Sequence, residues 1–202
     1  MAGGTGSERV LDVREATFGL LRGLGLTTVF GNPGSTEETF LANFPSNLGD
    51  LHAAWPITQP DAFYTMASGG LGWSTPASVG IALAERDSGR NRPVVTVVGD
   101  GSFQYSVQSI WTAAQLNLPI LFVVLRNGEY AILKAFAEVE DSPGVPGLDI
   151  PGIDIVSLVR GYGCHAARAD TLDVLRSEAA AAGRHAPTVL EVPIAATVPP
   201  LL

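Results

Sequence analysis

Short apolar runs rich in β-branched residues alternate along the chain with longer segments of helical period. The runs at 94–98, 120–125 and 188–192 have the length and composition of strands buried on both faces of a parallel sheet. Shorter strand-like segments stand at 27–30, 62–65 and 164–167, and helical spacing predicts helices over 8–24, 36–42, 75–84, 106–116, 130–137, 155–162 and 172–182. This alternation predicts an α/β fold with a doubly wound parallel sheet, whose ligand crevice lies at the carboxyl ends of its strands.

Two of the predicted strands end in glycine and oxygen-bearing side chains. The first is followed by Gly99-Asp100-Gly101-Ser102 and the second by Asn127-Gly128-Glu129-Tyr130. Asp100 offers a carboxylate, Asn127 an amide oxygen and Glu129 a main-chain carbonyl, which are hard oxygen ligands suited to Mg²⁺ or Ca²⁺. So few protein ligands leave room for phosphate oxygens. Gly99 and Gly101 allow close backbone approach, and we expect Ser102 to open a helix whose free N–H groups favour an anion.

The first loop has two other interpretations. Asp100 could serve only as a helix-capping residue, as an isolated aspartate between glycines often does. A dinucleotide-binding fingerprint would need a third glycine at position 104, where the chain has Gln104. The combination of Ser102 with Asn127, 27 residues after Asp100, therefore favours a site for a metal ion and a diphosphate.

Composition narrows the class of protein. The chain is 46% hydrophobic and 16% charged with a mean hydropathy of +0.25, so we expect a large core or a subunit interface. A homo-oligomer is the expected assembly. A net charge of −8 without a basic stripe argues against a nucleic-acid partner. The single cysteine, Cys164, excludes an intrachain disulfide. The longest apolar run, 118–125, is too short to span a membrane, and no signal peptide is visible, so a cytoplasmic protein is expected.

The two loops resemble a known motif. Gly99-Asp100-Gly101-Ser102 with Asn127 is similar to the thiamine diphosphate (ThDP) binding motif of the ThDP-dependent 2-oxo-acid decarboxylases, and the surrounding residues most resemble the benzoylformate decarboxylases. Further matching segments are 67–72, 111–115 and 145–154. One departure is visible, because Arg126 occupies the position of the first asparagine of the family's closing pair.

The resemblance implies roles for individual residues. Asp100, Asn127 and the Glu129 carbonyl would hold Mg²⁺, and a second group would contact the cofactor. In that group the Gly69 carbonyl accepts from the aminopyrimidine and Leu71 wedges beneath the cofactor. The group comprises Ser46, Gly69, Gly70, Leu71, Gly99, Gly101, Ser102 and Tyr130. Ser35 matches a serine that faces the substrate. Leu133 and Phe136 match apolar substrate surroundings, although their spacing also fits an ordinary core stripe.

The resemblance also divides the chain. Residues 1–45 are similar to the start of a pyrimidine-binding domain and residues 46–202 to the C-terminal diphosphate-binding domain, so we expect an internal deletion near 45/46. In the family, a glutamate of the pyrimidine-binding domain activates the cofactor, and the segment that would hold it is missing after Pro45. Glu37 and Glu38 do not replace it on sequence grounds.

The implied function is the non-oxidative decarboxylation of a small 2-oxo acid to an aldehyde and CO₂, impaired in this chain on its own. Whether the chain is an enzyme by itself stays open. One alternative is a non-catalytic assembly module with a vestigial site. Another is a ThDP carboligase of the acetolactate synthase type.

Overall fold

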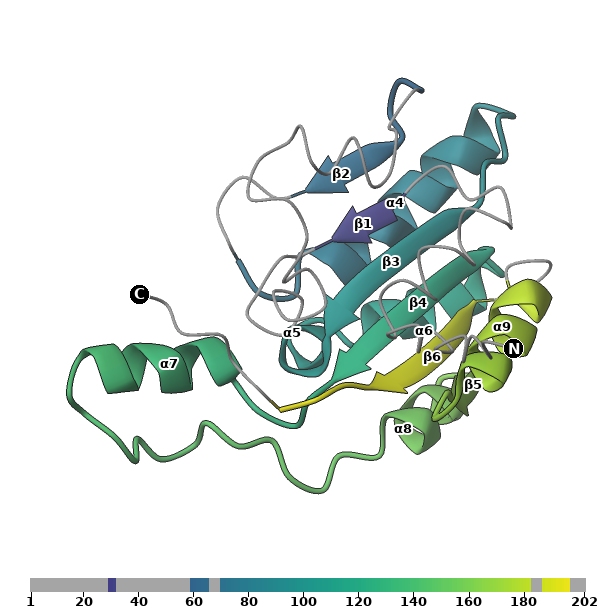
Figure 1. The fold of residues 1–202 in the computed structure, drawn as a ribbon. Helices are drawn as coiled ribbons and strands as arrows, with labels where there is room; N and C mark the ends of the chain where they lie inside the picture. Colours follow the sequence, from purple (N-terminus) through teal and green to yellow (C-terminus); the bar gives the residue numbers. More distant parts are fainter. Residues whose placement is uncertain (1–28, 32–58, 66–69, 183–186, 197–202) are drawn as a thin grey trace, which may run out of the picture.

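The computed structural model describes residues 29–31, 59–65, 70–182 and 187–196, and these build a six-stranded parallel sheet in the order β2-β1-β3-β4-β6-β5 (Figure 1). The strands are β1 (Val29–Gly31), β2 (Phe63–Thr65), β3 (Val94–Gly99), β4 (Ile120–Arg126), β5 (His165–Arg168) and β6 (Thr188–Pro193). The helices are α4 (Ser74–Asp87), α5 (Asp100–Gln104), α6 (Ser109–Gln115), α7 (Ala131–Val139), α8 (Ile155–Gly161) and α9 (Leu172–Ala181). The predicted α/β class with a doubly wound parallel sheet is confirmed.

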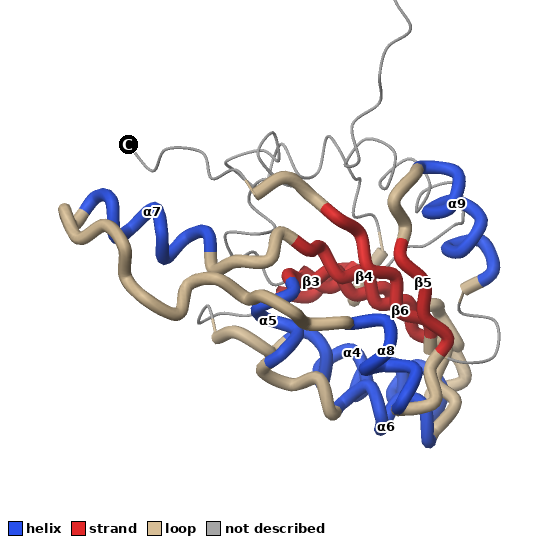
Figure 2. Tube along the Cα trace, turned by 90° about the horizontal axis from the view of Figure 1, so that it is seen from below, coloured by secondary structure: helices blue, strands red, loops and turns tan. Residues whose placement is uncertain are grey.

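Buried side chains cover both faces of the central strands, which is why those strands appear in the sequence as unbroken apolar runs. In β3, Val94 and Val98 belong to the core on one face, and Val95 and Val97 to the core on the other. Figure 2 shows α4, α6 and α8 over the first face and α9 over the second. Cys164 is buried in the first core.

One predicted helix starts later than its sequence suggested. The segment 106–116 becomes α6 only at Ser109. The preceding residues form turns, because Ser109 N donates to Ser106 O at 3.0 Å and Ile110 N to Val107 O at 3.0 Å, a spacing of three residues instead of four. The helices predicted over 8–24 and 36–42 lie outside the described residues.

Strand β1 lies inside the sheet, between β2 and β3. Val29 is paired in parallel with Phe63 on one side and with Val95 on the other. The chain passes from β1 to β2 on one side and then to β3 on the opposite side, so the strand order reverses between β1 and β3. Ligands of open α/β sheets bind outside the carboxyl ends of the strands at such a reversal. The loop after β3 therefore lies where a ligand site is expected.

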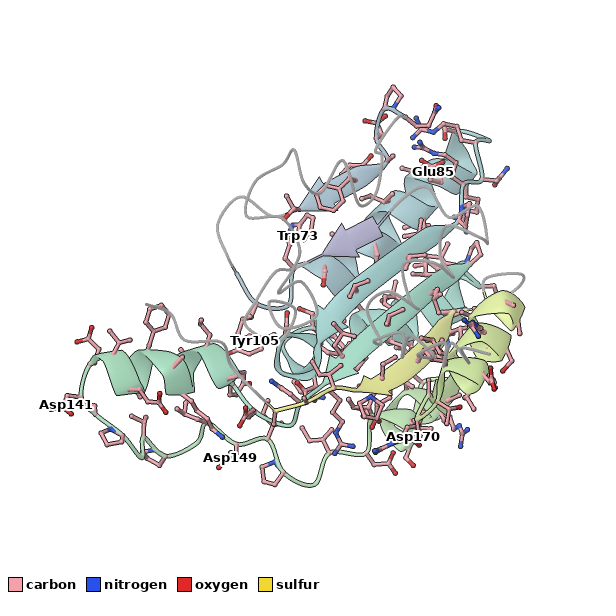
Figure 3. The ribbon with its side chains drawn as sticks, viewed as in Figure 1. Trp73, Glu85, Tyr105, Asp141, Asp149 and Asp170 are labelled. Carbon is pink, nitrogen blue, oxygen red and sulfur yellow. The ribbon has the colours of Figure 1, made fainter. Side chains whose placement is uncertain are left out.

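A buried ion pair holds the other end of the sheet. Glu85, near the end of α4, is 3% exposed and accepts hydrogen bonds from Arg92 Nη2 at 2.6 Å and Arg92 Nε at 3.1 Å. Arg90 Nη2 lies 2.9 Å from the same carboxylate, and Arg92 Nη1 donates to Pro60 O at 3.0 Å. The side-chain hydrogen bonds from Arg92 lower the pKa of Glu85 to about 2. This cluster ties the entry of β2 to the entry of β3, far from Tyr105 and Asp149 (Figure 3).

Candidate functional site

Asp100 joins the ends of two strands. It directly follows β3, is 3% exposed, and accepts hydrogen bonds from Gly101 N at 3.0 Å and from Gly128 N, in the loop after β4, at 2.8 Å. The two loops therefore meet, as their place at the ends of neighbouring parallel strands predicted. Burial raises the pKa of Asp100, while the hydrogen bonds from Gly128 and Gly101 and the charge of Arg126 act in the opposite direction. A buried carboxylate of this kind gains from a bound cation.

The helix after β3 begins earlier than expected. Instead of opening at Ser102, α5 starts at Asp100 and ends at Gln104, so Ser102 lies within a short helix of five residues. Gly99 is extended, with φ −71° and ψ 152°, and the turn begins immediately after it because Asp100 Oδ1 accepts from the next backbone amide.

The loop after β4 is held by a returning segment, residues 148–150, which we call the strap. Tyr130 N donates to Leu148 O at 2.7 Å and Ile150 N donates to Gly128 O at 2.8 Å, which places Glu129 opposite Asp149 in an antiparallel bridge. The backbone groups of successive residues in a paired segment face opposite sides. Glu129 N accordingly points away from the strap and donates to Asn127 Oδ1 at 3.2 Å. The Glu129 carbonyl shares that side, which faces the Asn127 side chain.

Tyr130 lies against the Asp100 loop. A Cβ atom added at Gly101 would lie 2.6 Å from Tyr130 Cε1 and 3.2 Å from Ile150 Cδ1, so only glycine fits between the ring and the loop. Burial raises the pKa of Tyr130, as do the charge of Tyr105 and a hydrogen bond with it. The structure therefore brings together Gly101, Tyr130 and Asp100, three of the residues singled out from the sequence.

The turn before α4 is tied to the same place. Gly72 N donates to Ser102 Oγ at 3.0 Å, and Ser102 is 5% exposed. Leu71, the predicted wedge, is 38% exposed, which leaves its side chain accessible next to the turn. Of the residues predicted to contact the cofactor or the substrate, three lie outside the described residues, namely Ser35, Ser46 and Gly69. The structure describes the predicted cofactor contacts Gly70, Leu71, Gly99, Gly101, Ser102 and Tyr130.

Gly72 is the residue on which the geometry of this turn depends. Its φ is +85°, and a Cβ atom there would lie 2.6 Å from Tyr105 Cβ and 2.7 Å from Ser106 Oγ. We expect Gly72→Ala to lower the free energy of unfolding by about 2 kcal/mol, through the left-handed backbone and the overlap with Tyr105. Urea denaturation measures it. The matched control is Gly80→Ala in α4, where nothing lies within 4 Å and φ is not positive, so alanine should stabilise the helix. Equal effects of the two substitutions would contradict the prediction.

Arg126, the departure from the motif, has a buried partner. Its Nη1 lies 2.8 Å from Glu191 Oε1 on β6, and Arg168 Nη1 lies 3.2 Å from the same oxygen. Glu191 is 2% exposed. The Arg126 guanidinium at the end of β4 is thus neutralised by Glu191 on the neighbouring strand β6. Asn127 follows Arg126 directly and precedes Gly128, whose amide donates to Asp100.

Helix α7 extends away from the sheet (Figures 1 and 2). Leu133 is 46% and Phe136 51% exposed, so the interpretation of their spacing as a core stripe is wrong for the described part of the chain. Ala131 is the one buried residue of this helix. The apolar side chains that matched substrate surroundings are therefore accessible on an extended helix beginning one residue after Tyr130.

Sequence reasoning missed the strap and two charged partners, Glu191 and Lys134. In the sequence, the segment 145–154 carries only a resemblance, and the pairing of residues 148–150 with residues 128–130 has no local signature. Among the described residues, no group of three or more His, Cys, Asp or Glu side chains could hold a metal ion by itself. A metal in this place would use the mixed set of carboxylate, amide and carbonyl oxygens, which suits Mg²⁺ or Ca²⁺.

Within the described residues no helix is long and apolar enough to cross a bilayer.

Comparisons with known proteins identify the family of the chain. The family profile described as thiamine pyrophosphate enzyme, C-terminal TPP binding domain, matches residues 47–192, and thiamine pyrophosphate is another name for ThDP. Benzoylformate decarboxylase of Pseudomonas aeruginosa is 41% identical over 140 residues, which cover 68% of this chain and 25% of that protein.

Two solved structures extend the comparison. The crystal structure of benzoylformate decarboxylase from Polynucleobacter necessarius superposes with a TM-score of 0.77 at 41% identity, covering 100% of this chain and 36% of that chain. The ThDP-dependent 4-hydroxybenzoylformate decarboxylase of Rhodococcus jostii gives a TM-score of 0.74 at 30% identity, covering 96% of this chain and 35% of that one. In the comparison with the Pseudomonas protein, this chain spans about a quarter of the length of that protein. The chain belongs to the thiamine pyrophosphate enzyme family, and its match is to the C-terminal cofactor-binding domain of that family.

Proposed function

We propose that the chain binds ThDP together with Mg²⁺ at the carboxyl ends of β3 and β4. The observation that supports this most is the carboxylate of Asp100, buried and joined to the Asn127 loop through Gly128 N at 2.8 Å. Side-chain oxygens of Asp100 and Asn127 and the Glu129 carbonyl would hold the metal, with Ca²⁺ as a substitute of the same chemistry.

The remaining residues would hold the cofactor around this metal. Gly99, Gly101, Ser102 and Tyr130 border the Asp100 loop and would contact the diphosphate, together with Ser46. Leu71 and the carbonyl of Gly69, beside Gly70, would orient the rings. The close fit of Tyr130 against Gly101 supports this assignment, because it places the tyrosine directly beside the Asp100 loop.

We further propose that the reaction served by this site is that of the benzoylformate decarboxylases, in which a small 2-oxo acid yields an aldehyde and CO₂. When bound, ThDP supplies the electron sink for loss of CO₂. The chain's own contribution is to bind and orient, with Leu133 and Phe136 on α7 and Ser35 offered to the substrate. A homo-oligomer, in which a second chain completes the site, fits the half-exposed apolar side chains of α7.

We also propose that the chain alone decarboxylates poorly. Among the described residues the buried carboxylates are Glu85, Asp100 and Glu191. Glu85 and Glu191 are engaged by arginines, and Asp100 is assigned to the metal. None of these three is therefore available to activate the cofactor, and loss of a positioned acid or base costs roughly 10²–10⁴ in rate.

Isothermal titration calorimetry tests the binding. We expect ThDP to bind the wild-type chain in the presence of Mg²⁺ and not after the metal is removed with EDTA. An assay of benzaldehyde formation from benzoylformate then tests the reaction, and we expect turnover far below that of a full-length benzoylformate decarboxylase measured alongside. Absence of Mg²⁺-dependent ThDP binding would overturn the proposed site, and turnover equal to that of the full-length enzyme would overturn the proposed deficiency.

A further inference from the structure

A single ammonium group links α7, the metal loop and the strap. Lys134, in the first turns of α7, donates from Nζ to Asp149 Oδ1 at 2.6 Å and also to Glu129 Oε2. Glu129 and Asp149 face each other in the antiparallel bridge, so Lys134 lies between their two carboxylates and neutralises both. Figure 3 shows Asp149 on the segment that returns beneath α7, well away from Asp141, which lies in the turn after α7.

Helix α7 and the residues that follow it bury few side chains of their own. Ala131 is the one buried residue of α7, Leu133 and Phe136 are about half exposed, and the residues 140–147 that follow the helix are exposed. The strap is attached by two backbone hydrogen bonds, from Tyr130 N to Leu148 O and from Ile150 N to Gly128 O, and Tyr130 and Ile150 also lie against Gly101. The orientation of Glu129 therefore depends on the strap, and the ion pairs of Lys134 are what link the strap and Glu129 to α7.

We propose that Lys134 is a positioning residue for the metal ion: by holding the side chains of Glu129 and Asp149 together, it keeps the Glu129 carbonyl on the side of the Asn127 side chain. This inference rests on the proposed function, because it assigns the Glu129 carbonyl to Mg²⁺. Groups that orient metal ligands from behind influence affinity strongly, and their replacement typically weakens metal binding roughly 10–100-fold.

The sign of the effect separates positioning from simple electrostatics. Lys134 is a cation near a cation site, and removing it leaves the carboxylates of Glu129 and Asp149 unpaired. If charge alone mattered, Lys134→Met would attract Mg²⁺ more strongly and tighten its binding. If Lys134 positions the carbonyl, the same substitution weakens Mg²⁺ binding in spite of the more negative surroundings.

The experiment titrates Mg²⁺ into the full chain in the presence of a fixed excess of ThDP, by calorimetry, for wild type, Lys134→Met and Lys134→Arg. We expect Lys134→Met to raise the Kd for Mg²⁺ about tenfold, and Lys134→Arg to stay near the wild-type value because it keeps the cation. The matched control is Arg176→Met on α9, which removes an equal charge from a half-exposed arginine paired with the exposed Asp173 and should leave the Kd unchanged.

A second readout does not depend on the cofactor. Hydrogen exchange of the Tyr130 and Ile150 amides in the cofactor-free chain should be faster in Lys134→Met, because those amides are the backbone bonds of the strap. Absence of Mg²⁺ binding by the wild-type chain would overturn the proposed function and this inference with it. Normal binding by the wild type, combined with unchanged or tighter binding by Lys134→Met, would overturn the positioning role alone.

Discussion

Replacing Asp100 by alanine should abolish the thermal stabilisation that Mg²⁺ and ThDP give the wild-type chain. A ligand at about 100 times its Kd stabilises a protein by about 2.7 kcal/mol, which for a chain of this size corresponds to a rise in Tm of roughly 5–10 °C. Asp100 is the one carboxylate in the proposed ligand set, so its removal should eliminate nearly all of this rise. Thermal unfolding with and without both ligands measures it.

The ligand-induced rise, and not the Tm itself, is the quantity to compare. Asp100→Ala also removes the acceptor of the Gly101 and Gly128 amides, which destabilises the free protein, while it relieves the burial of a carboxylate, which acts in the opposite direction. Asp173→Ala is the matched control, because the Asp173 side chain is 96% exposed on α9. A full ligand-induced rise in Asp100→Ala would show that the metal binds elsewhere.

Replacing Glu85 by glutamine should cost about 3 kcal/mol of unfolding free energy near neutral pH. The pKa of Glu85 is lowered from 4.5 to about 2, chiefly by the hydrogen bonds from Arg92. Each unit of such a difference is worth about 1.4 kcal/mol. Because the folded pKa lies below the unfolded one, this stabilisation is complete above about pH 4.5 and is lost as the pH falls toward 2.

The difference in stability between wild type and Glu85→Gln should therefore shrink as the pH is lowered across this range. Urea denaturation at several pH values measures it, and subtraction of the two curves isolates Glu85 from the other acids. Asp87→Asn is the control on the same helix, because Asp87 is 71% exposed and paired only with neighbouring Arg86 among the described residues. A difference that does not change with pH would mean that the Glu85 pair does not persist in solution.

The central strands were predictable because a strand buried on both faces is apolar at nearly every position. Val94 to Val98 and Ile120 to Leu125 are apolar at every position but Thr96, and each lies in the sheet within one residue of its predicted bounds. The meeting of Asp100 with the Asn127 loop followed from the same inference, since adjacent parallel strands deliver their carboxyl ends to one edge. Local pattern and sheet topology thus placed the core of the site.

The strap was beyond prediction for a physical reason. Its pairing joins residues 128–130 to residues 148–150 across the whole of α7, and neither segment has an alternating pattern or a turn that marks a hairpin. Lys134 was likewise unremarkable, because its two partners come from outside the helix face that periodicity describes. Contacts that depend on how a loop returns leave no trace in local sequence, whereas contacts set by a sheet do.

The location of β1 has a consequence for shortening the chain from its start. The strand occupies the slot between β2 and β3, and neighbouring strands are about 4.8 Å apart. A version beginning after Gly31 would have to close a gap of one strand width or leave the backbone donors and acceptors of Thr96 and its neighbours facing water. Removal of residues 1–31 should consequently yield a protein that aggregates through an unpaired strand edge. Most of the residues proposed to bind the cofactor would still be present.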